Sequence, residues 1–339
     1  MRYIGNKTKL LSFLTTKIRQ LGIEPGVVHD AFAGTAAVGR ALKAAGWRVH
    51  SSDLMTYSYV MQRAHVVASQ PRGIAALARR LTLDVPARDG FFARNFSAAG
   101  GRMYFTDENA RRIDGARTAL DEWRRSGAIG DDAFYVLLAG IIEGADRVAN
   151  TAGVYAAFIK RWQPNALKPF AVVTEAPIAS RARCRAYQAD AVDVARTLGR
   201  IDLLYLDPPY NTRQYAGYYH VPELIARGWS DDGVALRGKT GLIADGEQRS
   251  DWCSRRRAPG ALRALLEATC ARHVLVSYNT EGVIQDAELR SILADASVDG
   301  RVRRFTKRYK RYRADSDREG RRYKGDVVRE LLYYARLRA

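Results

Sequence analysis

The sequence predicts an α/β fold: a mostly parallel sheet with an antiparallel hairpin at its edge, and a mainly helical insertion. Three patterns predict it. Short apolar stretches alternate with helical ones near the amino terminus and again after residue 180, as in strands joined by crossover helices. The character of the chain changes from about residue 57 to 170, where the segments 107–126 and 131–149 have helical periodicity. The last two strand-like stretches, at about 298–312 and 326–338, can pair as an antiparallel hairpin.

The amino-terminal part is predicted as a helix followed by a strand–helix–strand unit. Residues 8–21 have the spacing of an amphipathic helix. Residues 27–34 (VVHDAFAG) are predicted as a strand that runs into a small-residue turn, and residues 36–46 as a helix that ends at a glycine. Residues 47–53 (WRVHSSD) form the second strand, which ends in an acidic residue.

Later stretches complete the sheet and define the insertion. The predicted strands are 183–190, 201–207 (IDLLYLD) and 272–279 (RHVLVSYN), and the clearest helices of the insertion are 107–126 and 131–149. Residues 211–262 are polar and glycine-rich, so they are expected to form an elaborated loop. We therefore expect a sheet domain made of residues 1–60 and 171–339, with residues 61–170 as the helical insertion.

Composition indicates a soluble basic protein. The 339 residues carry 55 Lys and Arg against 36 Asp and Glu, a net charge of +19, which makes a polyanion the first partner to consider. No apolar run is long enough to span a membrane, and no secretory signal is evident. Three scattered cysteines argue against a disulfide framework and favour a reducing cytoplasm.

Nearly half of the positive excess lies in one segment. Residues 301–324 contain 12 Lys and Arg and 3 Asp and Glu, interleaved with four aromatic residues. Basic groups neutralise phosphates, and aromatic rings can pack on sugars or bases, so the segment fits a nucleic-acid contact. A solvated basic edge strand is the alternative.

The first chemical signal is the turn after the first strand. Asp30 opens the sequence DAFAGTAAVG, in which small residues let a ligand approach the backbone beside a helix N-terminus. Asp53 stands 23 residues later, at the end of the next strand, where an acid can bind both ribose hydroxyls of a nucleoside. Together the two features favour nucleoside binding over a purely structural turn.

The second signal is the sequence DPPY, which begins at Asp207 after the apolar strand IDLLYL. Two prolines cannot continue a strand or a helix, so the chain leaves the sheet in a stiff, extended conformation. A carboxylate, the carbonyl of Pro208 and the ring of Tyr210 are then presented together. These groups suit a planar base with an exocyclic amine, which can donate two hydrogen bonds and stack; a proline-rich turn that ends a strand is the alternative.

With these motifs, the chain resembles the amino-group DNA methyltransferases, in particular the adenine-N6 enzymes of the alpha class, the Dam-like family. YIGNK (3–7) matches the amino-terminal motif that closes over the cofactor, residues 30–39 match the first cofactor motif with Ala33 at a position more often Gly or Cys, and DPPY matches the catalytic tetrapeptide. Segments at 100–114, 143–162, 211–220, 277–282 and 309–313 resemble a branch found in bacterial restriction–modification systems.

The resemblance implies a Rossmann-like sheet, S-adenosyl-L-methionine as the cofactor, and a role for the helical insertion in target recognition. The catalytic residues it implies are Asp207, Pro208, Pro209 and Tyr210. The cofactor-binding residues are Tyr3, Gly5, Asn6, Lys7, Asp30, Phe32, Ala33, Gly34, Thr35, Asp53, Leu54, Asp190, Ala191 and Asp207. No metal is expected, because the methyl donor is already activated and the five histidines show no ligand spacing.

The implied substrate is double-stranded DNA, from which adenine is rotated into the pocket. An aspartate in DPPY favours adenine, whereas SPPY would favour cytosine-N4. The candidate DNA contacts are Asn211, Arg213, Gln214, Tyr215 and His220 after the catalytic loop, Tyr155, Lys160 and Arg161 in the insertion, and Arg308, Lys310 and Arg311 in the basic segment. Those after the loop could equally make loop-stabilising hydrogen bonds.

Two other functions stay open at this point: an RNA adenine or guanine methyltransferase, and a catalytically idle DNA-binding protein with the same fold. Acceptor tests on duplex DNA and RNA separate the first from the leading hypothesis, and cofactor binding tests the second. We expect a monomer in the bacterial cytoplasm, with a cognate restriction endonuclease as a further partner. A fused nuclease is not expected, because the methyltransferase motifs account for most of the chain.

Overall fold

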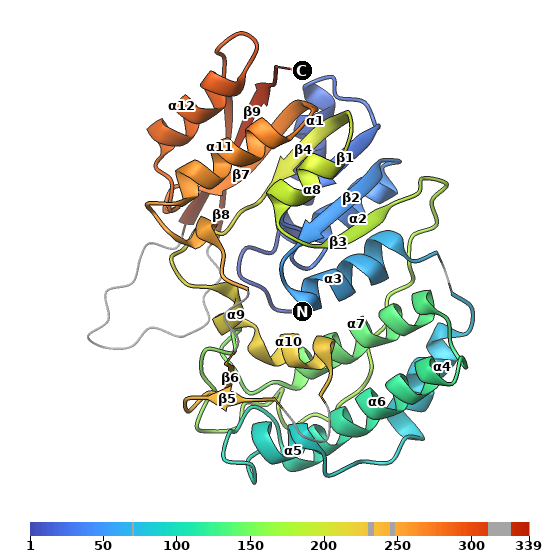
Figure 1. Cartoon of the computed structure of the whole chain (residues 1–339). Helices are drawn as coiled ribbons and strands as arrows, with labels where there is room; N and C mark the ends of the chain where they lie inside the picture. The colour runs from blue at the N-terminus through green and yellow to red at the C-terminus, as the bar shows by residue number, and fades with distance from the viewer. Residues whose placement is uncertain (70, 230–233, 245–247, 311–326, 339) are drawn as a thin grey trace. The chain divides into compact units, whose positions relative to one another are not determined.

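The computed structural model describes residues 1–69, 71–229, 234–244, 248–310 and 327–338 (Figure 1). The chain separates into two compact units. We call them the sheet unit, which comprises Lys7–Leu54, Ser180–Gln214 and Arg249–Ala339, and the helical unit, which comprises Met1–Asn6, Met55–Ala179 and Tyr215–Gln248.

The sheet unit is built on seven strands in the order β3-β2-β1-β4-β7-β9-β8. The strands are β1 (Val27–Asp30), β2 (Arg48–Asp53), β3 (Arg185–Gln188), β4 (Ile201–Leu206), β7 (Ala271–Asn279), β8 (Arg303–Lys310) and β9 (Val327–Arg336). The pairs from β3 to β7 are parallel, and β9 is antiparallel to both β7 and β8. The predicted mostly parallel sheet with an antiparallel edge hairpin is confirmed.

The strand order reverses at the centre of this sheet. From β1 the chain goes outward to β2 and β3 and then returns to β4 on the other side of β1. In open parallel sheets, ligands bind beyond the carboxyl ends of the strands at such a switch point. The register pairs Asp30 of β1 with Tyr205 of β4, so the first residues after both strands emerge at the same edge.

Helices cover the two faces of the sheet. The crossovers through α2 (Ala37–Ala44) and α8 (Ala191–Thr197) run in opposite directions, so right-handed connections put these two helices on opposite faces. One apolar core joins α8, α11 (Ala258–Ala268) and α12 (Asp286–Ala296) to the strands. On α1 (Leu11–Gln20), which follows the short 3-10 helix η1 (Thr8–Leu10), Leu14 and Ile18 are buried.

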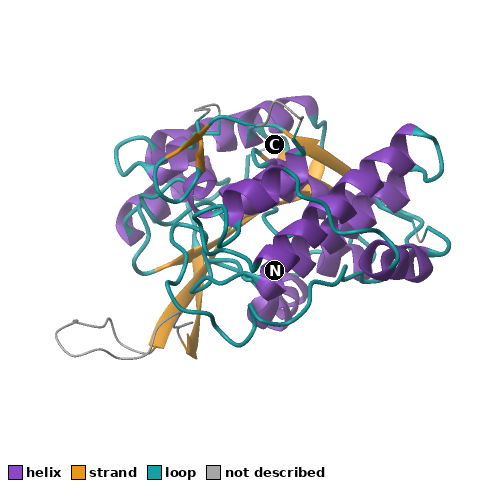
Figure 2. Ribbon diagram, turned by 90° about the horizontal axis from the view of Figure 1, so that it is seen from below, coloured by secondary structure: helices purple, strands orange, loops and turns teal. Residues whose placement is uncertain are grey.

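Two long helices, α6 (Asp107–Arg125) and α7 (Asp131–Val148), form the largest part of the helical unit. Figure 2 shows the helices and strands of the described chain in different colours. In α6, the Thr106 side chain accepts a hydrogen bond from the backbone N–H of Asn109, which caps the helix. The apolar helix α7 is buried along most of its length. The other helices are α3 (Thr56–Gln62), the π-helical turn η2 (Arg63–Val67), α4 (Ile74–Leu83), α5 (Phe91–Phe96), α9 (Tyr215–Tyr218) and α10 (His220–Arg227).

Residues 211–262 contain more regular structure than their composition indicated. They include α9, α10, the short strand pair β5 (Leu236–Arg237) and β6 (Leu242–Ile243), the 3-10 helix η3 (Asp251–Cys253) and the start of α11. Internal contacts also assign Tyr215–Gln248 to the helical unit, whereas the sequence placed this segment in the sheet domain. One link within this unit is a buried carboxylate: Glu223 of α10 accepts hydrogen bonds from the backbone N–H groups of Thr56 and Tyr57, in the first turn of α3.

Candidate active site

The turn after β1 brings together two motif residues that lie far apart in sequence. Gly34 has a positive φ of 52°, and its N–H donates to Oδ2 of Asp53 over 2.9 Å. The neighbouring N–H of Ala33 donates to the carbonyl of Ser52 over 3.0 Å. Asp53 is therefore oriented beside the turn by the turn's own backbone, as a nucleoside-binding acid requires.

The DPPY segment leaves β4 without regular secondary structure. Asp207 follows directly after Leu206, the last residue of the strand, and its side chain is 15% exposed. Pro208 is buried, and Tyr210 is half-buried and packs against the apolar core. The ring of Tyr210 lies near a cation, with its centroid 5.7 Å from Nζ of Lys7.

Asp207 belongs to a buried cluster of charges around Lys7. The Lys7 ammonium lies 3.0 Å from Oδ1 of Asp207 and donates a hydrogen bond to Oε1 of Glu330 over 2.6 Å. Oε1 of Glu330 also accepts from the hydroxyl of Ser277 over 2.7 Å. Oδ1 of Asp207 is fully buried, and the Lys7 ammonium is its charged neighbour.

The electrostatics of this cluster place Asp207 near its titration midpoint at neutral pH. Burial raises the pKa of Asp207 to about 7, with the Lys7 ammonium opposing the rise and the Glu330 carboxylate adding to it. For Lys7, burial lowers the pKa, but the nearby Asp207 and Glu330 carboxylates outweigh burial and hold the pKa well above its usual value. Lys7 is therefore charged, and the ionised and protonated forms of Asp207 are close in free energy at neutral pH.

Asp30 forms the second acidic group at the switch point. Its side chain is 1% exposed, and the backbone N–H of Gly39 in α2 is the hydrogen-bonding group that opposes the effect of burial on its pKa. Burial raises the pKa of Asp30 to about 8, and the neighbouring Asp207 carboxylate adds to the rise. A buried acid close to a second acid fits a ligand that brings positive charge or N–H donors to this edge of the sheet.

Other candidate cofactor residues of the sheet unit line the same strand ends. Asp190 is the N-cap of α8, where its Oδ1 accepts from the N–H of Val192 over 2.8 Å, and Ala191 is buried behind it. Phe32 packs edge-on against Trp252 with ring centroids 4.8 Å apart. Thr35 lies in the turn before α2, and Leu54 follows directly after Asp53.

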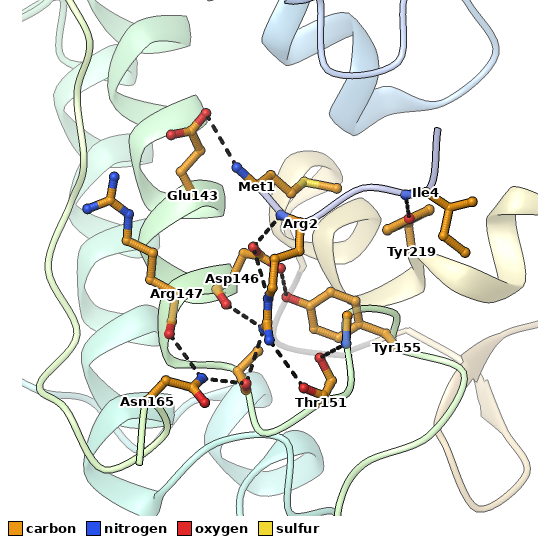
Figure 3. A network of polar contacts seen from close by, with 12 residues as sticks. Met1, Arg2, Ile4, Glu143, Asp146, Arg147, Thr151, Tyr155, Asn165 and Tyr219 are labelled. Atoms are coloured by element: carbon orange, nitrogen blue, oxygen red, sulfur yellow. Dashed lines mark hydrogen bonds and ion pairs between the residues drawn. The ribbon is translucent and has the colours of Figure 1, made fainter. Parts of the chain in front are cut away.

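The amino-terminal motif YIGNK (3–7) is divided between the units. Tyr3, Gly5 and Asn6 belong to the helical unit, and Lys7 belongs to the sheet unit. Figure 3 shows how the chain start is held: the Arg2 guanidinium donates to the carbonyls of Asp146 and Thr151, and the N–H of Ile4 donates to the hydroxyl of Tyr219 over 2.7 Å. The ring of Tyr3 stacks on Tyr219, with centroids 4.7 Å apart.

Two predicted DNA contacts are buried instead. His220 is 1% exposed; its Nε2 bonds to the carbonyl of Thr240, and burial lowers its pKa to about 4. Tyr155 is also 1% exposed, and its hydroxyl donates to Oδ1 of Asp146 over 3.2 Å (Figure 3). These two side chains pack the interior of the helical unit, so we correct their assignment and leave them out of the DNA contacts.

The residues directly after DPPY include loop-stabilising groups. Gln214 is clamped to Ser250: its amide donates to the Ser250 carbonyl over 3.1 Å and accepts from the Ser250 N–H over 2.8 Å. Oδ1 of Asn211 accepts from the N–H of Arg213, whose side chain is exposed. Tyr215 packs at a tilt against Tyr3, with centroids 5.7 Å apart.

Of the remaining candidate DNA contacts, three have side chains whose exposure the structure describes and two do not. Lys160 and Arg161 are exposed in the helical unit, and Arg308 is exposed on β8. Lys310 ends β8, but its side chain lies outside the described residues, as does all of Arg311.

No helix in the described ranges is long and apolar enough to cross a bilayer, and no three His, Cys, Asp or Glu in those ranges group as metal ligands.

Glu330 and Ser277 are site residues that the sequence interpretation missed. Glu330 is 3% exposed and lies in the middle of the apolar strand β9. An acidic residue next to the apolar run LLYYA is the signal that could have found it, because a buried charge needs a partner. Ser277 stands in the segment 277–282, which was noted for its resemblance but given no role.

An oriented acid at the end of β2 and a prolyl loop after β4 lie at the switch point of the sheet, an arrangement that fits an enzyme acting on the exocyclic amine of a base. A family model for D12 class N6 adenine-specific DNA methyltransferases matches residues 3–242. The chain belongs to this family.

Individual relatives agree with this assignment. The chain is 35% identical over 338 residues to the type II methyltransferase M.NlaIII of Neisseria lactamica, a match that covers 98% of each protein. It is 32% identical to the modification methylase LlaI of Lactococcus lactis subsp. lactis and to M.FokI of Planomicrobium okeanokoites, and both matches cover 98% of this chain. The chain spans 54% and 52% of the lengths of those two relatives.

Proposed function

We propose that this protein transfers the methyl group of S-adenosyl-L-methionine to the N6 amine of an adenine at a specific site in duplex DNA. The observation that carries the proposal is the carboxylate of Asp207 at the switch point: its side chain is 15% exposed directly after β4, while its buried Oδ1 lies 3.0 Å from the Lys7 ammonium. A carboxylate that is held by a cation on its buried side and partly exposed can accept a hydrogen bond from an amine that arrives with the substrate.

The residues at the strand ends fit the cofactor. Asp53 would accept hydrogen bonds from the ribose hydroxyls, the turn at Ala33 and Gly34 would admit the ligand to the backbone, and Asp30 would receive the positive charge of the methionine part. Asp190 is proposed to bind the adenine ring of the cofactor. Tyr3, Gly5, Asn6, Lys7, Phe32, Thr35, Leu54 and Ala191 complete the proposed cofactor site. When bound, the cofactor supplies a methyl group that its sulfonium has already activated.

In the proposed reaction, the protein orients the exocyclic amine of the flipped adenine towards the methyl group. The lone pair of the adenine amine is conjugated with the ring, which makes the nitrogen a poor nucleophile. Asp207 and the carbonyl of Pro208 accept its two hydrogens, which favours a tetrahedral nitrogen whose lone pair points at the methyl group. Stacking on Tyr210 offsets part of the few kcal/mol that flipping the base costs. Asp207 can then take the extra proton of the methylated amine, because its pKa of about 7 suits a general base.

The DNA interface is proposed from exposed residues. Lys160 and Arg161 of the helical unit are proposed to contribute to target recognition, as is the loop with Asn211 and Arg213. Arg308, Lys310 and Arg311 are proposed to grip phosphates. We further propose that the protein acts as a monomer in the bacterial cytoplasm, alongside a cognate restriction endonuclease of the kind that type II relatives imply.

Expression in a host that lacks DNA methylation tests the function. Genome sequencing with detection of modified bases should show N6-methyladenine at one short sequence, and the purified protein should methylate duplex DNA that carries this sequence. An unmodified genome from cells that contain folded protein would contradict the proposal. Methylation of RNA, but not of DNA, would replace it with an RNA methyltransferase.

A further inference from the structure

A cavity of about 230 Å³ lies beside the last two strands of the sheet. Its walls come from the end of β7, the start of α12 and the paired strands β8 and β9, all of which belong to the sheet unit. The described lining includes none of the proposed cofactor or catalytic residues. Because a water molecule occupies about 30 Å³ of the liquid, the cavity has room for a ligand the size of a phosphate group.

Arg329 of β9 gives this cavity a positive charge that its carboxylate does not balance. Asp286 also lines the cavity, but its carboxylate accepts hydrogen bonds from the guanidinium of Arg304 over 3.0 and 3.1 Å and from the hydroxyl of Tyr333 over 2.5 Å. Among the described residues, Arg329 makes no ion pair and no side-chain hydrogen bond. The guanidinium of Arg329 is therefore available to an anion that enters the cavity.

The register of the two strands places a second arginine directly opposite Arg329. This residue is Arg308 of β8, and both side chains are exposed. Like charges that face each other across a strand pair destabilise a sheet. Within the described ranges, Arg308 has no carboxylate partner either. An anion bound beside the two guanidinium groups would relieve their repulsion.

Strand β9 carries the cavity on one face and the charged cluster of Lys7 on the other. Successive side chains of a strand point to opposite faces, and Arg329, Leu331 and Tyr333 line the cavity. Glu330, between them, instead accepts a hydrogen bond from Lys7. The neighbouring strand β7 also pairs with β4, the strand that leads into Asp207. The cavity therefore lies at the same edge of the sheet as the proposed catalytic loop.

Neutral hydrogen-bonding groups complete the lining. They are the hydroxyls of Thr280 and Thr306 and the amide of Gln285, and in the described part of the chain none of the three side chains has a hydrogen-bond partner. Arginine, hydroxyl and amide groups are the side chains that proteins use to contact DNA phosphates. A phosphate fits this set well, because its oxygens can accept from a guanidinium and from hydroxyls at the same time.

We propose that this cavity binds one phosphate of the DNA backbone, held by the Arg329 guanidinium with Thr280 and Thr306 as further donors. The inference rests on the proposed function and deepens it. Arg308 was selected from the basic composition of its segment, whereas the cavity names three partners to which the sequence gave no role. A phosphate fixed one strand away from β7 would set the position of the duplex relative to Asp207.

The test is a scan of duplex DNA that carries the recognised sequence, in which a neutral methylphosphonate replaces one phosphate at a time. Binding of each duplex is measured with the wild-type protein and with Arg329→Gln. At one linkage near the target adenine, the replacement should weaken wild-type binding about tenfold, because charged hydrogen bonds are lost. At the same linkage, Arg329→Gln should lose no more than about twofold, since its contact is already absent.

The matched control is Arg336→Gln, which makes the same charge change at the other end of β9, opposite the start of β7. This variant should show the wild-type loss at every linkage. Equal losses for the wild type and folded Arg329→Gln at every linkage would overturn the inference.

A second arm separates a DNA phosphate from a small anion. Inorganic phosphate is titrated into the DNA-free protein at constant ionic strength, and binding is followed by calorimetry. Saturable binding that is lost in Arg329→Gln, together with a scan that does not depend on Arg329, would assign the cavity to the small anion and overturn the DNA assignment. The two proposals fail differently: absent methylation by the wild type refutes the proposed function, whereas an active wild type with such a scan refutes only the role of the cavity.

Discussion

Removing the Lys7 ammonium should move the pH dependence of methylation towards alkaline pH. Asp207 must be ionised to accept the adenine amine, and burial raises its pKa to about 7, so activity should rise with pH through neutrality. Lys7→Met removes the positive charge that opposes this rise and keeps a side chain of similar length. It also leaves Glu330, whose carboxylate raises the pKa of Asp207, without its cation.

The size of the shift follows from the 3.0 Å between Nζ of Lys7 and Oδ1 of Asp207. Even at the dielectric constant of water, two unit charges at this distance interact by about 1.4 kcal/mol, which is about one pKa unit. A buried site screens charges less than water does, so one unit is a lower bound. At pH 7 the activity should fall from about half of its plateau to about a tenth or less.

The assay is kcat/KM for the methyl donor measured from pH 5.5 to about 9.5, because this quantity reports groups of the free protein. Lys9→Met is the matched control, since Lys9 is exposed two residues away and its loss should leave the acid limb in place. An acid limb of folded Lys7→Met at or below that of the wild type would refute the electrostatic reasoning.

Three further changes test other parts of the account. Asp53→Ala should weaken binding of S-adenosyl-L-methionine at least about tenfold in calorimetry, because the carboxylate proposed to accept from both ribose hydroxyls is lost; unchanged affinity would exclude Asp53 from the ribose site. Charge removal at Arg308, Lys310 and Arg311 should reduce the slope of log affinity for DNA against log salt by about 0.9 for each phosphate that is no longer neutralised, and an equal slope would argue against phosphate binding there. Gly144→Ala should destabilise the protein by about 1–3 kcal/mol in thermal unfolding, because a Cβ on this residue of α7 would meet the carbonyl of Ala171, whereas Gly130→Ala meets nothing within 4 Å and serves as the control.

The regular parts of the fold could be predicted because their signals are local. Strand β4 is an uninterrupted apolar run, and α6 and α7 have clear helical periodicity. Helix α10 was missed because what holds it is not local: Glu223 accepts hydrogen bonds from residues 166 and 167 positions earlier in the chain. No reading of the residues around 220 alone contains that information.

The residues of the candidate site also divide into those with a local sequence signal and those whose position depends on distant residues. Asp30, Asp53 and Asp207 stand directly at strand ends, so a parallel sheet brings them to one edge. Glu330 could not be placed, because its partner Lys7 lies 323 residues away in sequence. The burial of His220 and Tyr155 could not be predicted from the sequence either. Both are residue types that contact DNA, and their interior position depends on the packing around Tyr104.

The central claim is that Asp207 presents an adenine amine for methylation. Duplex DNA with the recognised site should be incubated with isotope-labelled S-adenosyl-L-methionine and the wild-type protein or Asp207→Ala, digested to nucleosides, and analysed by mass spectrometry. The account predicts labelled N6-methyladenine with the wild type and none above background with Asp207→Ala, while both proteins bind the DNA. Label on another base, or near-normal methylation by Asp207→Ala, would contradict it.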